Sequence, residues 1–205
     1  MKTKSRLPKH IDKPFFKGDV MSPSWAYVRW LESLDIDDSI YSMAFKEAGD
    51  KIVKGIHRDY DGTPADIFFM PITYLYRHSL ELKLKYIIKL GCDLDLIAFD
   101  EKLKKNLCKH GLHPLWNYVR KIIAIHWPTI EKRDLDKAGS VIQAFHSVDR
   151  GGQNLKYSKN TSGGKTLNNM PVSVDLSHLQ VVFETLFNFL DGCEIALYDA
   201  LELKK

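Results

Sequence analysis

The sequence predicts an all-α protein, an up-and-down helical bundle with a glycine-rich loop or small hairpin near residues 150–170. Two observations carry this prediction. Apolar residues recur every three or four positions over several long segments, which is the spacing of one helix face. Glycine and proline gather between those segments, where they end helices and form loops. The chain has 205 residues, 44% hydrophobic and 27% charged, which is ordinary for a globular protein with a sizeable core.

The first half of the chain predicts an extended arm followed by three helices. The arm contains three prolines and scattered charge, and the helix after it has Ser22 or Ser24 as a cap. The third helix is long and apolar on nearly all sides, so we expect it inside the bundle, and we expect Gly91 to end it. The expected elements are an arm over 1–23 and helices over 24–34, about 38–55 and about 65–90.

The second half predicts three more helices, with a segment of mixed character over 93–109 before them. Residues 149–171 are rich in Gly, Asn, Ser and Lys, and 155–157 and 165–167 are the candidate strands of a small hairpin there. We expect residues 24–205 to form one domain. The expected helices cover about 113–126, 131–148 and 176–203.

Charge and cysteine content limit the functional classes. The net charge of +4, from 30 basic and 26 acidic residues, does not by itself indicate nucleic-acid binding. Basic residues do cluster at 2–13, 102–110 and 150–165, which fits either a solvated surface or an anionic ligand such as RNA. Three cysteines without a paired motif are typical of reduced cytoplasmic thiols. No apolar run approaches the ~20 residues of a membrane span, so we expect a cytoplasmic protein without a membrane partner.

The central helix carries a narrow polar row between apolar residues, which we call the central stripe. At ~100° per residue its five members fall within one ~100° arc, and Ser79 and Lys83 fall on the opposite face, where we expect water. A polar row framed by apolar residues predicts that this side meets a cleft or a partner. The alternative is an Arg77–Glu81 ion pair that only braces the bundle. The central stripe consists of Tyr74, Arg77, His78, Glu81 and Lys85.

Two loop segments supply further candidate site residues. His110 precedes a helix and follows several lysines, and it can join Arg77 and Glu81 if its turn folds back over the central helix. Otherwise it caps the next helix or bonds a backbone carbonyl. Lys156 and Tyr157 are candidates for contacting a phosphate and stacking on a base, or for pinning a flexible hairpin to the bundle.

Metal and cofactor motifs are weak in this sequence. The pairs His78-x-x-Glu81 and His110-x-x-His113 offer four potential ligands, but a second carboxylate pair is missing. The spacings CxxC and HExxH do not occur, nor does a complete phosphate-binding loop. We therefore expect neither a metal nor a cofactor.

Several segments, in order along residues 70–200, resemble an uncharacterised bacterial group related to the HEPN superfamily. The helix Arg77-His78-x-x-Glu81-Leu82-x-Leu84-Lys85 is similar to the Arg-His-x-x-Glu-Leu-x-Leu-Lys helix of that group. The turn His110-Gly111-Leu112-x-x-Leu115-Trp116 resembles its His-Asp-Leu-x-x-Leu-Trp turn. Two further similarities are Asp149 followed by Gln153-Asn154-Leu155-Lys156-Tyr157, and Val174-Asp175-Leu176-x-x-Leu179 at the start of the last helix.

The resemblance implies a helical, often dimeric protein, and HEPN proteins of known activity are frequently metal-independent RNases in toxin–antitoxin, CRISPR or phage-defence systems. In such an enzyme a His moves the proton of the ribose hydroxyl and an Arg stabilises charge on the phosphate. In this chain we expect these roles to fall to Arg77 with His78 or His110, assisted by Glu81. A non-catalytic module that binds RNA, a nucleotide or a protein through the central stripe is the alternative.

The catalytic signature of HEPN RNases, an Arg and a His separated by a few residues, has one literal match in the chain. Arg120 and His126 provide it. Six positions along a continuous helix rotate a side chain by roughly 240°, so the two side chains are expected to diverge. We therefore attribute this match to chance.

Overall fold

The computed structural model describes Ala26 and residues 37–58, 65–157, 159, 163–167 and 170–204. Internal contacts divide the chain into two units, Met1–Asp37 and Asp38–Lys205. The predicted arm over 1–23 and the predicted helix over 24–34 lie outside the described residues, apart from Ala26. All described helices belong to the second unit, except for Asp37 at the start of the first one.

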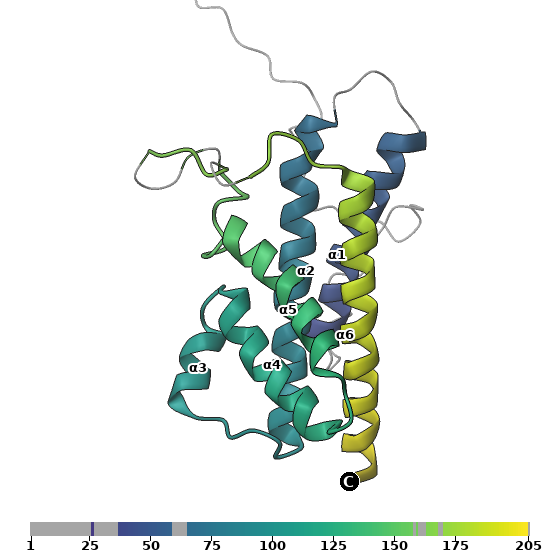
Figure 1. The fold of residues 1–205 in the computed structure, drawn as a ribbon, viewed down its shortest axis with the longest axis vertical. Helices are drawn as coiled ribbons and strands as arrows, with labels where there is room; N and C mark the ends of the chain where they lie inside the picture. The colour runs from purple at the N-terminus through teal and green to yellow at the C-terminus, as the bar shows by residue number, and fades with distance from the viewer. Residues whose placement is uncertain are drawn as a thin grey trace, which may run out of the picture. The chain divides into compact units, whose positions relative to one another are not determined.

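The described residues form six helices and no strand, which confirms the predicted all-α helical bundle (Figure 1). None of these helices is both long and apolar enough to cross a membrane. In chain order they are α1 (Asp37–Arg58), α2 (Asp66–Asp93), α3 (Glu101–Leu107), α4 (Leu112–His126), α5 (Lys132–Val148) and α6 (Leu176–Lys204).

The core lies around α2, which packs along α6 on one side and α4 on another. Apolar side chains of all three helices are fully buried here, and the rings of Tyr76 and Phe183 stack with their centroids 4.3 Å apart. α5 covers α4 and α6, and the short α3 contacts α4. Because α2 has neighbours on several sides, its all-round apolar sequence reflects an interior position, as predicted.

Two boundaries differ from the prediction. The segment 93–109 contains α3, whose first turn is capped by Asp100, since the Asp100 carboxylate accepts a bond from the backbone N–H of Leu103 at 2.7 Å. Gly91 does not end α2, which continues to Asp93. A Cβ at Gly91 would lie 2.4 Å from Cδ1 of Ile122, so this glycine serves the close approach of α2 to α4 rather than a helix end.

The prediction that Ser79 and Lys83 face water is wrong. Both side chains are buried, because α1 and α6 cover this face of α2. Ser79 exchanges hydrogen bonds with Ser42 of α1, its hydroxyl donating to the Ser42 carbonyl at 2.7 Å. The Lys83 ammonium donates to Glu194 at 2.7 Å and to Asp191 at 2.8 Å, both on α6. Partners for a buried charge thus come from helices that are distant in the sequence.

The glycine-rich loop between α5 and α6 is described at 149–157, 159, 163–167 and 170–175. Among its described residues, the expected hairpin is reduced to one antiparallel bridge between Lys159 and Lys165. The Thr166 hydroxyl also donates to the carbonyl of Tyr157 at 2.9 Å. Leu155 is buried and anchors the start of the loop against the bundle.

Candidate functional site

The central stripe of α2 is covered by two turns of the same chain. Arg77 and Glu81 are 2% exposed, whereas the other three members of the stripe are half-buried. The covering segments are the turn before α4, which carries His110, and the turn after α5, which begins at Asp149. The two central residues of the stripe, Arg77 and Glu81, therefore contact turns of the same chain.

Arg77 holds the two turns on α2. Its Nε donates to the carbonyl of Asp149 at 3.1 Å and lies 3.5 Å from the Asp149 carboxylate. Its Nη1 donates to Glu81 at 3.2 Å, and its Nη2 donates to the carbonyl of His110. With all three guanidinium nitrogens engaged and the side chain buried, Arg77 fixes the geometry of the site and does not face a ligand.

The turn after α5 depends on Asp149 and Gly152. The Asp149 carboxylate accepts bonds from the backbone N–H groups of Gln153 and Asn154, at 2.8 and 3.0 Å, and is fully buried. Gly152 has a φ of +72°, and a Cβ there would lie 3.0 Å from Cβ of His110. Neither residue was predicted to belong to the site; the signal was an Asp followed by two glycines, which is typical of a tight turn.

Glu81 and His110 form the exposed end of the polar cluster. One oxygen of Glu81 accepts from the Lys85 ammonium at 2.8 Å and lies 2.9 Å from Nδ1 of His110. Burial raises the pKa of Glu81, but the hydrogen bonds from Lys85 and His110 and the charges of Lys85 and Arg77 outweigh it and lower the pKa below 4.5. The carboxylate is thus ionised at neutral pH, which assigns the proton of neutral His110 to Nδ1.

The side chain of His110 is half-exposed, although one of its ring nitrogens is held by Glu81. The exposed fraction is 52%, and the nitrogen that is held is Nδ1, whose carboxylate partner is 2% exposed. Nε2 is therefore the ring nitrogen that carries the lone pair. The contact between Nδ1 and Glu81 fixes the tautomer and the orientation of the ring. This is the arrangement that a general base requires.

His78 and Lys156 lie beside the Glu81–His110 pair, and both contact the ring of Tyr74. The His78 ring stacks on Tyr74 at 5.9 Å and meets the edge of Phe45 at 4.4 Å. The Lys156 ammonium lies 5.3 Å from the centroid of the Tyr74 ring. Burial lowers the pKa of His78; the charge of Glu81 opposes this, and those of Lys156, Arg77 and Lys85 add to it. His78 is thus a weak proton acceptor next to a cation that faces the solvent.

The other predicted residues lie apart from this cluster. Tyr157 is 62% exposed and follows Lys156 on the loop. Arg120 pairs with Asp136 of α5 at 2.6 Å, and His126 packs against Trp127. The rings of His113 and His146 lie 6.0 Å apart beneath the His110 turn. Among the described residues, no group of three or more His, Cys, Asp and Glu side chains is arranged to hold a metal ion.

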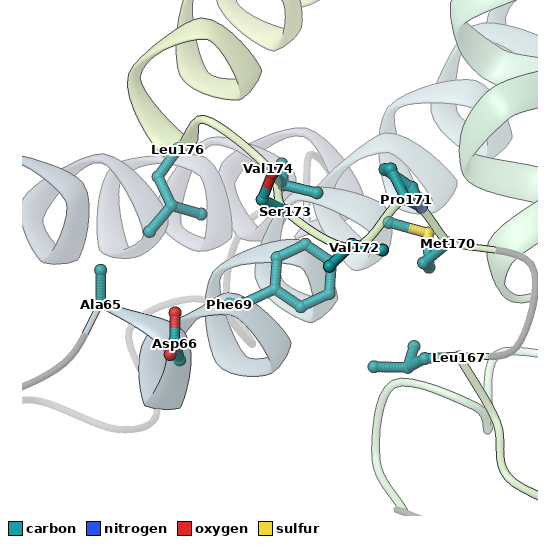
Figure 2. A pocket seen from close by; sticks show the side chains of 10 residues that line it. All are labelled: Ala65, Asp66, Phe69, Leu167, Met170, Pro171, Val172, Ser173, Val174 and Leu176. Atoms are coloured by element: carbon teal, nitrogen blue, oxygen red, sulfur yellow. The ribbon is translucent and has the colours of Figure 1, made fainter.

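Pockets lie on other parts of the surface. One of about 290 Å³ is formed by the start of α2 and residues 167, 170–174 and 176, and Figure 2 shows its lining side chains. One of about 400 Å³ lies between α5 and α6, and one of about 420 Å³ lies between α6 and the segment that joins α4 to α5. The residues of the central stripe and His110 line none of these three.

Comparison of the chain with family models, with curated proteins and with solved structures finds no match.

Proposed function

We propose that this protein is HEPN-like and cleaves RNA without a metal, with His110 as the general base. The observation that carries the proposal is the pairing of the exposed His110 with the buried Glu81 at 2.9 Å. The resemblance of the α2 helix, the His110 turn and the Asp149 segment to the HEPN-related group supports it, because these three segments meet in one cluster.

The proposed reaction is attack of a ribose 2′-oxygen on the adjacent phosphorus. Nε2 of His110 takes the proton of the 2′-hydroxyl, the 2′-oxygen bonds to phosphorus, and the bond to the 5′-oxygen breaks. The 5′-oxygen takes a proton from water, and the hydroxide that remains takes the proton from the His110 imidazolium. The products are a 2′,3′-cyclic phosphate and a 5′-hydroxyl, and His110 is again neutral. Glu81 stabilises the imidazolium that forms on His110, as a buried carboxylate does in a catalytic triad.

The remaining residues of the cluster have supporting roles in this proposal. Lys85 and Lys156 provide the positive charge that attracts the phosphate and offsets its developing charge. Arg77 is a positioning residue, since its donors are occupied by Asp149, Glu81 and His110. His78, with its lowered pKa, shapes the site next to Lys156 and is not required to transfer a proton.

A second candidate function is a non-catalytic module that binds RNA, a nucleotide or a protein partner. The exposed Lys156 ammonium, 5.3 Å from the centroid of the Tyr74 ring, favours it. The burial of the Arg77–Glu81 pair instead favours the alternative in which that pair only braces the bundle. In either case we propose a cytoplasmic component of bacterial defence or of a toxin–antitoxin system, acting as a homodimer. The defence and toxin–antitoxin settings rest on the resemblance alone.

Cleavage of a mixed RNA pool in the presence of a chelator tests the proposal. We expect the wild type to produce 2′,3′-cyclic phosphate ends and His110→Ala to lose about a hundredfold or more of the rate, the usual contribution of a general base. The matched control is His178→Ala, an exposed histidine on α6, which should cleave like the wild type. Circular dichroism verifies that each variant is folded.

A parallel binding measurement separates the two functions. Fluorescence anisotropy with a labelled RNA, comparing wild type with Lys156→Ala, reports binding without cleavage. Binding that weakens in Lys156→Ala, with no cleavage by the wild type, would replace the RNase by the binding module. A wild type that neither binds nor cleaves RNA would contradict both functions.

A further inference from the structure

The pocket at the start of α2 has the chemistry of a site for one flat, hydrogen-bonding ring. Its volume of about 290 Å³ is at the small end of ligand pockets, which suits a single base or nucleoside. Figure 2 shows the ring of Phe69 in the middle of the lining group, with residues 170–174 running beside it and Asp66 at one side. Aliphatic side chains from the loop complete an apolar wall.

The polar groups of the pocket select against a phosphate. The polar residues in its lining are Asp66 and Ser173, and none of the described residues that line the pocket is a lysine or an arginine. A carboxylate repels a phosphate but accepts hydrogen bonds from N–H groups. The aromatic ring of Phe69 offers a surface on which a planar ring can stack. The pocket therefore suits the base of a nucleotide whose phosphates lie outside it.

The location of the pocket connects it to the His110 site. Asp66 and Arg77 are eleven residues apart on α2, which is nearly a whole number of turns and a rise of roughly 16 Å. Both residues therefore lie on the same side of the helix, with Tyr74 and its Lys156 neighbour between them. Lys156 and the pocket residues Leu167, Met170 and Ser173 belong to the same segment between α5 and α6. An extended strand of a few nucleotides can span the two places.

We infer that this pocket binds an unpaired guanine base of the RNA strand that the His110 site acts on, an inference that rests on the proposed function. Guanine is the base that offers two adjacent N–H donors, N1–H and the 2-amino group, on one edge, and a carboxylate accepts both together. Adenine and cytosine present a ring-nitrogen acceptor beside their amino group, which the Asp66 carboxylate repels. The substrate is therefore single-stranded at this position, because a paired guanine has its Watson–Crick edge occupied.

Nucleoside binding tests the pocket independently of any reaction. Titration of the full chain with guanosine, inosine, adenosine and uridine, followed by calorimetry, should show guanosine as the tightest ligand. Inosine, which lacks the 2-amino group, should bind about tenfold more weakly, as should guanosine to Asp66→Asn. The matched control is Asp199→Asn, an exposed carboxylate on α6, which should bind guanosine like the wild type. Equal binding of all four nucleosides, or none, would overturn the inference.

Cleavage of oligonucleotides separates this inference from the proposed function. RNAs with a single guanosine should be cut a fixed few nucleotides from it by the wild type, and at unrelated positions by Asp66→Asn. Cleavage by the wild type without regard to guanosine would overturn the guanine site and leave the RNase standing. Selective guanosine binding without cleavage of any RNA would support the guanine site and overturn the proposed RNase.

Discussion

Two histidines next to the site, His78 and His146, have a pKa below the ordinary 6.5. For both, burial is the largest cause. The charges of His113, Arg150 and Arg77 further lower the pKa of His146, and Asp149 opposes them. Nδ1 of His146 is buried without a hydrogen-bond partner. A proton on either ring therefore costs more in the folded chain than in the unfolded chain.

We predict that the free energy of unfolding decreases as the pH falls below about 6.5. Between the lowered pKa values and 6.5 the unfolded chain binds more protons than the folded one, so stability is complete above this window and is lost on acidification. One unscreened proton would change the free energy of unfolding by ~1.36 kcal/mol per pH unit. Because solvent screens both rings in part, the loss should be a fraction of this value. Urea unfolding at several pH values measures it.

Variants assign this pH dependence to the two rings. His78→Phe retains an aromatic ring between Tyr74 and Phe45 and should flatten the dependence, and His146→Gln should do the same. His178→Gln, on the exposed surface of α6, should leave it unchanged. An equal slope in all four proteins would show that neither buried ring is responsible.

Single residues of the site differed in how far the sequence could predict them. Arg77, Glu81 and Lys85 could be grouped because helical spacing alone brings them together. The approach of His110 to Glu81 was one of two alternatives, since it required a turn to fold back over α2. Asp149 belongs to the site through long-range packing of the turn after α5, a contact that no local spacing encodes.

At the scale of the helices, a buried ionic cluster joins α1, α2 and α6. Lys83 of α2 is 1% exposed, bonds Glu194 and Asp191, and lies 4.7 Å from the centroid of the Phe187 ring. The other oxygen of Glu194 accepts from the hydroxyl of Ser39 in α1 at 2.5 Å. Removing one member of such a cluster leaves its partner as an uncompensated buried charge.

We predict that Lys83→Met lowers the free energy of unfolding by about 3–5 kcal/mol, because Glu194 then stays charged and buried. The control is Lys137→Met, whose pair with Asp134 is exposed and should contribute below about 1 kcal/mol. In Lys83→Met/Glu194→Leu much of the loss should be recovered. Chemical denaturation measures all three, and a similar cost for the two single variants would refute the role of burial.

The same cluster shows why the sequence misplaced one face of the central helix. Periodicity locates the apolar residues of α2, but it does not distinguish a lysine in water from a lysine that meets acids on another helix. Gly91 presents the same difficulty, because a glycine that ends a helix and one that admits a neighbouring side chain look alike locally. Helix number and type were predictable over 113–148 and 176–203, where apolar spacing is clear.

At the scale of the whole bundle, α5 and α6 present a largely apolar surface. Phe189 of α6 lines both the pocket of about 400 Å³ beside α5 and the pocket of about 420 Å³ beside the segment that joins α4 to α5. Val181 and Ile195 on α6 are 60% and 55% exposed. Burying such a surface between two copies removes apolar area from water and supports the proposed homodimer.

We predict that the wild type has twice the mass of a single chain in light scattering at micromolar concentration. Val181→Glu should shift the protein to the monomer, because it places a charge within the apolar surface of α5 and α6. Met43→Glu is the matched control, since Met43 is 53% exposed on α1, outside that surface, and should leave the dimer intact. A wild type that stays monomeric would contradict the homodimer, and a Val181→Glu protein that stays dimeric would place the interface elsewhere.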